Sequence, residues 1–175
     1  IFSDFNYGVL PQALVDSITV TAKSRAVLLV ADSQSSSQIG NIARFVGMDL
    51  ITPTEREARL SLRDSDSGLI VLADELRALA NAQTGFLTLG PDGILIRGGK
   101  NSLIQDSLTE RVEALNNRPI DVAGGGDSLL VTAALALASG ATAYEAALAS
   151  SIAAAIQVSR LGNNPLRLAE VKVVI

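Results

Sequence analysis

The sequence predicts an α/β protein: three layers, with helices on both faces of a mostly parallel sheet. Short apolar runs alternate along the chain with longer amphipathic segments, which is the pattern of parallel strands joined by helices. The runs at residues 26–31 and 49–52 are short, as expected of strands covered on both faces. The chain has 175 residues, 48% of them hydrophobic, so it suffices for one ordinary domain.

The first half of the chain supplies most of the alternation. The apolar start at Ile1 looks like the end of a buried strand. Pro11 precedes an amphipathic stretch, and Ser67 is a plausible N-cap for a later one. We expect helices at residues 12–23, 35–45, 55–62 and 69–82.

The second half opens with a hairpin and closes with helices. Two short apolar runs, residues 86–89 and 94–97, flank a turn from Gly90 to Gly93. Residues 98–118 are polar and read as irregular. Residues 129–158 are rich in alanine and are divided at Gly140, so we expect two buried helices rather than one membrane span of about 20 residues.

Composition excludes several kinds of chemistry. Lysine and arginine number 14 against 18 acidic residues, a net charge of −4, which argues against nucleic-acid binding. The absence of cysteine and histidine excludes disulfides, Cys/His zinc sites, thiol nucleophiles and Ser-His-Asp triads. Acid–base chemistry therefore falls to Asp, Glu, Lys or Tyr. No signal peptide is visible, and we expect a cytoplasmic protein without a membrane partner.

A glycine run before the first alanine-rich helix is the strongest chemical signal. Residues 121–127 read Asp-Val-Ala-Gly-Gly-Gly-Asp, with a helix expected to begin near Asp127. Glycines let the backbone approach a ligand, and N–H groups at a helix N-terminus favour an anion such as phosphate. A carboxylate at that place suits proton abstraction from an alcohol during phosphoryl transfer. Spacing alone equally allows a tight loop with Asp127 as a helix cap.

The run resembles the C-terminal signature, Asp-x-x-Gly-Ala-Gly-Asp, of the ribokinase-like (phosphofructokinase-B type) carbohydrate kinases. Three further segments match this family in order: 51–58 its Asn-x-x-Glu segment, 87–93 its Thr-Leu-Gly-x-x-Gly turn, and 153–162 its last helix. Residues 3–8 resemble the Ser-Asp-Tyr-x-x-Gly of the heptose-phosphate kinase branch, which feeds ADP-heptose synthesis. The resemblance implies a Rossmann-like, ribokinase-like fold and an ATP-dependent sugar kinase.

The resemblance also assigns the reacting groups. Asp127 matches the catalytic base, and Gly124, Gly125 and Gly126 match the anion hole for the γ-phosphoryl group. Glu57 matches the acidic residue that organises Mg²⁺ through water. The alternative for Glu57 is a solvated charge in the first turn of a helix.

Nucleotide and monovalent-cation positions follow in the same way. The resemblance places the nucleotide at Thr88, Gly90, Gly93 and Ser151, and a monovalent cation such as K⁺ at Asp121 and Ala123. An ordinary hairpin turn and the start of a loop are the alternatives at these two places. The implied partner is a small-molecule sugar or sugar phosphate, and a homodimer is compatible with the family.

Some positions depart from the family pattern. Thr54 stands where the family usually has Asn, Gly125 replaces Ala, Ser151 replaces an Asn near the adenine, and residues 32–34 lack a common Lys. We interpret residues 1–175 as the C-terminal portion of a single kinase domain, with the sugar-recognition residues preceding Ile1. The alternatives are a non-catalytic or regulatory nucleotide-binding module and an inert scaffold.

Overall fold

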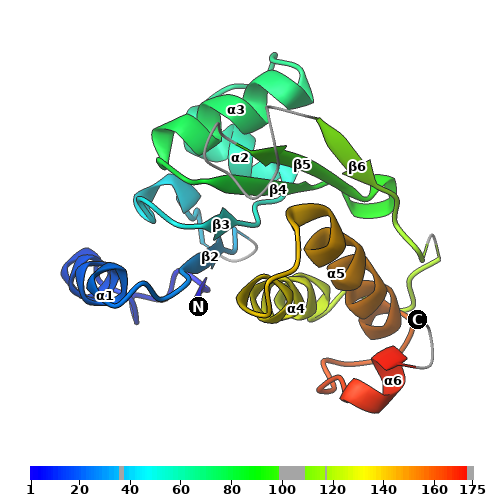
Figure 1. Ribbon diagram of the computed structural model, residues 1–175. Helices are drawn as coiled ribbons and strands as arrows, with labels where there is room; N and C mark the ends of the chain where they lie inside the picture. Colours follow the sequence, from blue (N-terminus) through cyan, green and yellow to red (C-terminus); the bar gives the residue numbers. More distant parts are fainter. Residues whose placement is uncertain (36–37, 99–108, 117, 173–175) are drawn as a thin grey trace.

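The computed structural model describes residues 1–35, 38–98, 109–116 and 118–172, and its centre is one six-stranded sheet (Figure 1). The strands lie in the same order in the sheet as in the chain. They are β1 (Phe2–Asp4), β2 (Val30–Ser33), β3 (Leu50–Ile51), β4 (Thr84–Thr88), β5 (Ile94–Gly98) and β6 (Glu110–Val112). Strands β1 to β4 pair in parallel, whereas β5 and β6 are antiparallel to their neighbours.

Helices cover both faces of this sheet. The α-helices are α1 (Gln12–Ser24), α2 (Glu55–Leu62), α3 (Leu69–Leu79), α4 (Gly125–Ala138), α5 (Ala143–Val158) and α6 (Leu168–Lys172). Two short 3₁₀ turns, η1 (Ile42–Arg44) and η2 (Gly90–Asp92), complete the elements. In Figure 1, α2 and α3 lie on one side of the sheet and α4 and α5 on the other. The predicted three-layer α/β/α fold is confirmed.

Alternation along the strands divides the core between these layers. Ala31, Ile51 and Leu87 pack toward α1, α2 and α3 in one apolar cluster. Their neighbours Val30, Leu50 and Phe86 pack toward α4 and α5 in the other. Because side chains alternate between the faces of a sheet, the side chain two residues along from any of these points to the same layer.

Most predicted elements are confirmed. The helices at 12–23 and 55–62, the hairpin strands and the two alanine-rich helices agree with α1, α2, β4, β5, α4 and α5. The strand expected at 26–31 is displaced to β2, because α1 ends in a turn in which the Val27 amide donates to the Ala22 carbonyl. No helix among the described residues is long and apolar enough to cross a bilayer.

Three expectations were wrong. Of the helix expected at 35–45 the described residues contain only η1, because Ser35 Oγ and Asn41 Oδ1 accept backbone N–H groups and favour turns. Gly68, not Ser67, occupies the N-cap of α3, since the Ser67 amide donates to Asp64. The supposedly irregular 98–118 segment contributes β6, which pairs with β5; residues 99–108 and 117 lie outside the described part.

Candidate functional site

Polar side chains line up at the carboxyl ends of the parallel strands. Ser3 of β1 lies opposite Asp32 of β2 in the sheet register. By alternation, Asp32 shares the face of Val30, Thr52 that of Leu50, and Thr88 that of Phe86. Ser3, Asp32, Thr52 and Thr88 therefore all point to the layer of α4 and α5. Ligands of open α/β sheets bind at this edge.

Three carboxylates lie near enough for Glu57 and Asp127 to act electrostatically on Asp32, and we call Asp32, Glu57 and Asp127 the carboxylate site. They come from the end of β2 and the first turns of α2 and α4. Burial and the negative charges of Glu57 and Asp127 raise the pKa of Asp32 to about 7. The Thr52 hydroxyl opposes that rise by donating to Asp32 Oδ1 over 3.4 Å. This edge thus accumulates negative charge that a cation would relieve.

Asp127 is presented by the first turn of α4. Gly124 is the N-cap residue of α4, and no side chain caps this helix, so the helix-cap role considered for Asp127 is not what the structure shows. Asp127 Oδ1 instead accepts a hydrogen bond from the Ser3 hydroxyl at 3.3 Å, across 124 residues of chain. The Asp127 carboxylate is half-buried and open to a ligand from the carboxyl edge.

Glu57 is fixed more tightly than Asp127. Its Oε2 accepts the Thr54 amide at 2.8 Å while the Thr54 hydroxyl accepts the Glu57 amide, which is a capping box. Its Oε1 accepts the Ser35 amide at 2.9 Å. The carboxylate is buried and joins the start of α2 to the segment after β2. Thr54, the residue that departs from the family's Asn, is therefore the N-cap of α2.

The glycine run is the start of a helix rather than a loop before one. Gly124 has φ +77°, and a side chain there would fall on Asn163, so only glycine fits. Gly125 and Gly126 are already helical and belong to the first turn, where amides have no intrahelical acceptor. Gly125 is buried, and its amide donates to the Val122 carbonyl at 3.2 Å. Gly126 is exposed, and an added Cβ there would meet open space. Of the three glycines, Gly126 is therefore the exposed one at the N-terminus of α4, next to Asp127.

Asp121 and Ala123 are brought together, but within a network of internal bonds. Asp121 accepts the amides of Ala123 and Gly162 at 3.0 and 2.9 Å, and these bonds lower the pKa of its carboxyl. The buried Gln157 side chain donates to the Ala123 carbonyl at 3.2 Å. These contacts tie the glycine run to the end of α5.

The four predicted nucleotide positions separate into two pairs. Thr88 and Gly90 lie at the end of β4 and line a cavity. Gly93 has φ +88°, and a Cβ there would collide with the backbone of Val112, so this glycine serves the packing of β6. Ser151 is buried and donates to the Glu113 carbonyl at 3.0 Å. Both residues of the second pair are committed to contacts within the chain.

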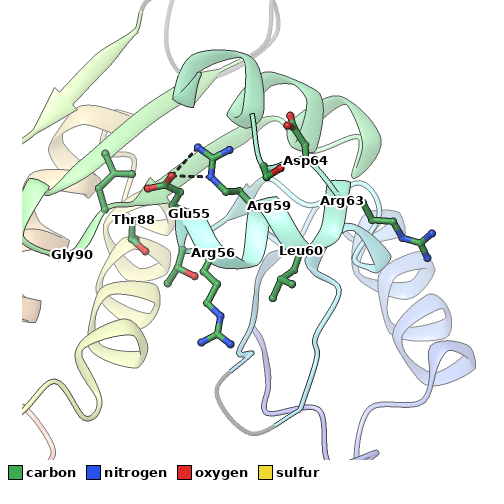
Figure 2. A pocket seen from close by; sticks show the side chains of 11 residues that line it. Glu55, Arg56, Arg59, Leu60, Arg63, Asp64, Thr88 and Gly90 are labelled. Carbon is green, nitrogen blue, oxygen red and sulfur yellow. Dashed lines mark hydrogen bonds and ion pairs between the residues drawn. The ribbon is translucent and has the colours of Figure 1, made fainter. Parts of the chain in front are cut away.

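The cavity beside Thr88 has a volume of about 670 Å³ and runs along α2 (Figure 2). We call it the arginine groove, because Arg56 and Arg59 of α2 and its C-cap residue Arg63 line it. Its lining residues are Thr54, Glu55, Arg56, Arg59, Leu60, Arg63, Asp64, Ser65, Thr88, Leu89 and Gly90. Arg59 is paired with Glu55 at 2.8 Å, whereas Arg56 points away from that pair in Figure 2.

Sequence reasoning assigned no individual role to Asp32, Ser3 or the arginines of the groove. Asp32 ends an apolar run, and that position was a usable signal for a residue at the carboxyl edge. Nothing local linked Ser3 to Asp127. Among the described residues, no group of three His, Cys, Asp or Glu side chains is close enough to cage a metal.

Comparison with known families gives a consistent result. The family model described as "pfkB family carbohydrate kinase" matches residues 2–167. The bifunctional protein HldE of Desulfatibacillum aliphaticivorans is 30% identical over 177 residues, covering 98% of this chain and 34% of that protein. HldE of Helicobacter hepaticus is 28% identical, covering 93% of this chain and 32% of its own length. The chain spans about a third of these curated relatives.

Solved structures agree on the fold. Phosphofructokinase-2 from Escherichia coli, solved with substrates and products, has a TM-score of 0.76 at 16% identity; the match covers 98% of this chain and 54% of that one. Ribokinase from Giardia lamblia has a TM-score of 0.75 at 23% identity, with coverages of 93% and 54%. Arabidopsis thaliana ribokinase, complexed with ribose and ATP, has a TM-score of 0.76 at 17% identity, with coverages of 94% and 53%.

Proposed function

The chain belongs to the pfkB family of carbohydrate kinases, and on that premise we propose that it supplies the phosphoryl-transfer site of an ATP-dependent sugar kinase. The observation that carries the proposal is the position of Asp127, a carboxylate beside the exposed Gly126 in the first turn of α4. In this reaction a sugar hydroxyl oxygen bonds to the γ-phosphorus of ATP. The bond from that phosphorus to the β,γ-bridging oxygen breaks, and ADP leaves.

Asp127 is the proposed general base. Its carboxylate takes the proton of the attacking hydroxyl, and the hydrogen bond from Ser3 to Oδ1 leaves Oδ2 for this role. A positioned base contributes typically about 10²–10⁴-fold to rate. The alternative is a non-catalytic nucleotide-binding module. It does not explain why Asp127, a carboxylate that does not cap α4, stands at a helix N-terminus suited to anions.

The glycine run is the proposed anion hole, and the amide of Gly126 is its proposed donor, because the Gly125 amide donates to the Val122 carbonyl at 3.2 Å. The Gly126 amide lies at the N-terminus of α4, where the helix dipole adds about half a positive charge. Charge develops on the transferring phosphoryl oxygens, and fixed N–H donors stabilise it without reorganisation. Gly124, with φ +77°, forms the turn that precedes the Gly126 amide.

The carboxylate site fits Mg²⁺ in its donor chemistry. Magnesium prefers carboxylate oxygens and keeps several waters, so it does not need the closed cage that the described residues lack. Glu57 and Asp32 would hold it, Glu57 through water, and the ion would neutralise phosphate charge during transfer. The raised pKa of Asp32 agrees with a site that is short of positive charge. A monovalent cation such as K⁺ is proposed at the Ala123 carbonyl and the Asp121 carboxylate.

The substrate class is proposed from the relatives. Both HldE proteins cover nearly the whole chain, and residues 3–8 match the heptose-phosphate kinase branch. A heptose phosphate is therefore the proposed acceptor.

The test is phosphoryl transfer by the intact protein. With Mg²⁺ and γ-labelled ATP, a panel of sugars and sugar phosphates should show saturable labelling of a heptose phosphate. Asp127→Asn should abolish labelling, while Asp16→Asn, an exposed carboxylate of α1, should leave it unchanged. ATP binding without transfer to any acceptor would favour the non-catalytic module instead.

A further inference from the structure

We propose that Gln157 is a positioning residue for phosphoryl transfer, because its buried side-chain amide holds the glycine run in the orientation that presents Gly126 and Asp127 to a ligand. This inference rests on the proposed function and adds to it a residue to which the family resemblance gives no role. Gln157 touches neither substrate nor nucleotide in this account. It acts through the backbone carbonyl of Ala123.

The Gln157 side chain is fully buried near the end of α5, and both ends of its amide are hydrogen-bonded inside the chain. Its Nε2 donates to the carbonyls of Ala123 and Gly162, each at 3.2 Å. Its Oε1 accepts a hydrogen bond from Arg160 at 3.0 Å. Since a guanidinium group only donates, Arg160 fixes which end of the amide faces the two carbonyls. A buried amide is costly unless its polar groups are paired, and these contacts pair them.

Asp121 and Gln157 join the same two residues through complementary groups. Asp121 accepts the amides of Ala123 and Gly162, whereas Gln157 donates to the carbonyls of those residues. The backbone just before the glycine run is thus held to the loop after α5 by both its N–H and its C=O group. We call Asp121 and Gln157 the backbone clamp.

The backbone clamp lies directly before the residues proposed for phosphoryl transfer. Ala123 precedes Gly124, whose φ of +77° leads the chain into the first turn of α4. Among the described residues no side chain caps this helix, so contacts with the end of α5 orient its start. Rotation of the Ala123 peptide would displace the Gly126 amide and Asp127 together. A displacement of about 1 Å in such groups can lower a rate about a hundredfold.

The proposed monovalent cation would use the Ala123 carbonyl that Gln157 already engages. A carbonyl oxygen has two lone pairs, so the amide and a cation can act on it together. Removal of the amide would leave the cation to hold this carbonyl without help. Turnover of a variant that opens space there should therefore depend more steeply on K⁺ than turnover of the wild type. A packing role of Gln157 predicts no such change.

The experiment measures kcat and the KM for ATP of the intact protein, with a heptose phosphate as acceptor, in a series of KCl concentrations. Tetramethylammonium chloride keeps the ionic strength constant. Gln157→Met keeps the length of the side chain and removes its donors, whereas Gln157→Ala opens the space between the two carbonyls. We expect kcat to fall about tenfold in both, with a smaller change in KM. KCl should restore turnover in Gln157→Ala more than in Gln157→Met.

The matched control is Ser150→Ala. Ser150 is also a buried polar residue of α5, but its hydroxyl donates to the Ala146 carbonyl within the helix. Its kcat and KCl dependence should equal those of the wild type. Thermal unfolding verifies that all variants are folded at the assay temperature.

Three results would overturn the inference. They are wild-type kcat in Gln157→Met, an equal loss of kcat in Ser150→Ala, and a KCl dependence of Gln157→Ala equal to that of the wild type. Failure of the proposed function looks different, because wild-type protein would then transfer no phosphate to any acceptor. Hydrogen exchange still tests the backbone clamp in that case: amides of residues 121–128 should exchange faster in Gln157→Met than in wild type or Ser150→Ala. Equal exchange in all three proteins would overturn the inference.

Discussion

The two sides of the first turn of α2 carry opposite charge. Glu57 accepts the Ser35 amide and lies near the carboxylate of Asp32, whereas the preceding residue, Arg56, lines the arginine groove. Consecutive residues of a helix point about 100° apart, so one turn serves both sites. Glu57 is buried and doubly hydrogen-bonded, while Arg56 is exposed.

On the proposed function, the chemical step belongs to the carboxylate site and not to the arginine groove. A ligand held only at the carboxylate site would meet three acidic groups, which repel a phosphate unless a cation intervenes. A ligand held only in the arginine groove would meet cations but no base. On the proposed function, a magnesium–nucleotide complex would supply that cation at the carboxylate site. Variants on the two sides should therefore fail in different ways.

The largest effect is expected at Asp127. Asp127→Asn keeps the shape of the first turn of α4 but removes the proposed base, so kcat should fall about 10²–10⁴-fold while nucleotide affinity stays close to wild type. Steady-state kinetics and nucleotide titration of the intact protein measure the two quantities. Near-normal turnover would show that Asp127 takes no part in proton transfer.

Gly126→Val should change ATP affinity without a large change in the stability of the fold. An added Cβ meets open space at this helical position, so the fold should lose little stability. The branched side chain would nevertheless stand between the first-turn amides and a phosphate, and ATP affinity should fall about tenfold. A matched variant, Gly140→Ala, lies at a positive φ of +90° between α4 and α5, and should lower the unfolding temperature without changing ATP affinity. Unchanged ATP affinity and kcat in Gly126→Val would exclude the anion hole.

Ionisation of Asp32 should change the free energy of unfolding with pH. Its pKa is about 7 in the folded protein against an ordinary 3.8, so the folded state holds a proton that the unfolded state releases. The free energy of unfolding therefore falls as the pH rises from about 4 through 7. Asp32→Asn should stabilise the protein at pH 8 by about 2 kcal/mol, a discounted figure for a half-buried group.

Thermal unfolding without divalent cations measures the Asp32 effect. The gain of Asp32→Asn over wild type should disappear near pH 4, where the wild-type carboxyl is neutral in the folded protein. Asp16→Asn, on exposed α1, should show no such pH-dependent gain. An equal gain at pH 4 and pH 8 would mean that the charge of Asp32 is not the cause.

The smallest effect is expected at Ser3. Its hydrogen bond to Asp127 is long, at 3.3 Å, and exposed, so Ser3→Ala should lower kcat only about threefold and leave the KM for ATP unchanged. Ser3→Thr keeps the hydroxyl and should restore turnover. Equal losses in the alanine and threonine variants would mean that the hydroxyl does not orient the base.

The fold was largely predictable because its signals are local. The run at 49–52, the hairpin around Gly90 and the break at Gly140 each indicated an element that the structure contains. The helix predicted at 35–45 was wrong because the Ser35 and Asn41 side chains accept hydrogen bonds from the backbone and favour turns over a helix. Strand β6 was missed because its three residues owe their conformation to pairing with β5.

The site was only partly predictable. Asp127 and Glu57 follow from motifs, and the structure brings both to the carboxyl edge. The pairing of Ser3 with Asp127 depends on the register of β1 against β2 and on where α4 begins, which no local pattern encodes. Gly93 and Ser151 matched the family pattern, but their environment shows packing contacts with the segment around β6.

The division between the carboxylate site and the arginine groove is tested most directly by measuring kcat and the KM for ATP in one assay, for Asp127→Asn and for Arg56→Ala/Arg63→Ala. We expect Asp127→Asn to lose at least about a hundredfold in kcat with little change in KM. The double arginine variant should raise KM about tenfold with a smaller change in kcat. If the arginine variant lost kcat alone, or Asp127→Asn raised KM alone, binding and chemistry would not be divided between the carboxylate site and the arginine groove.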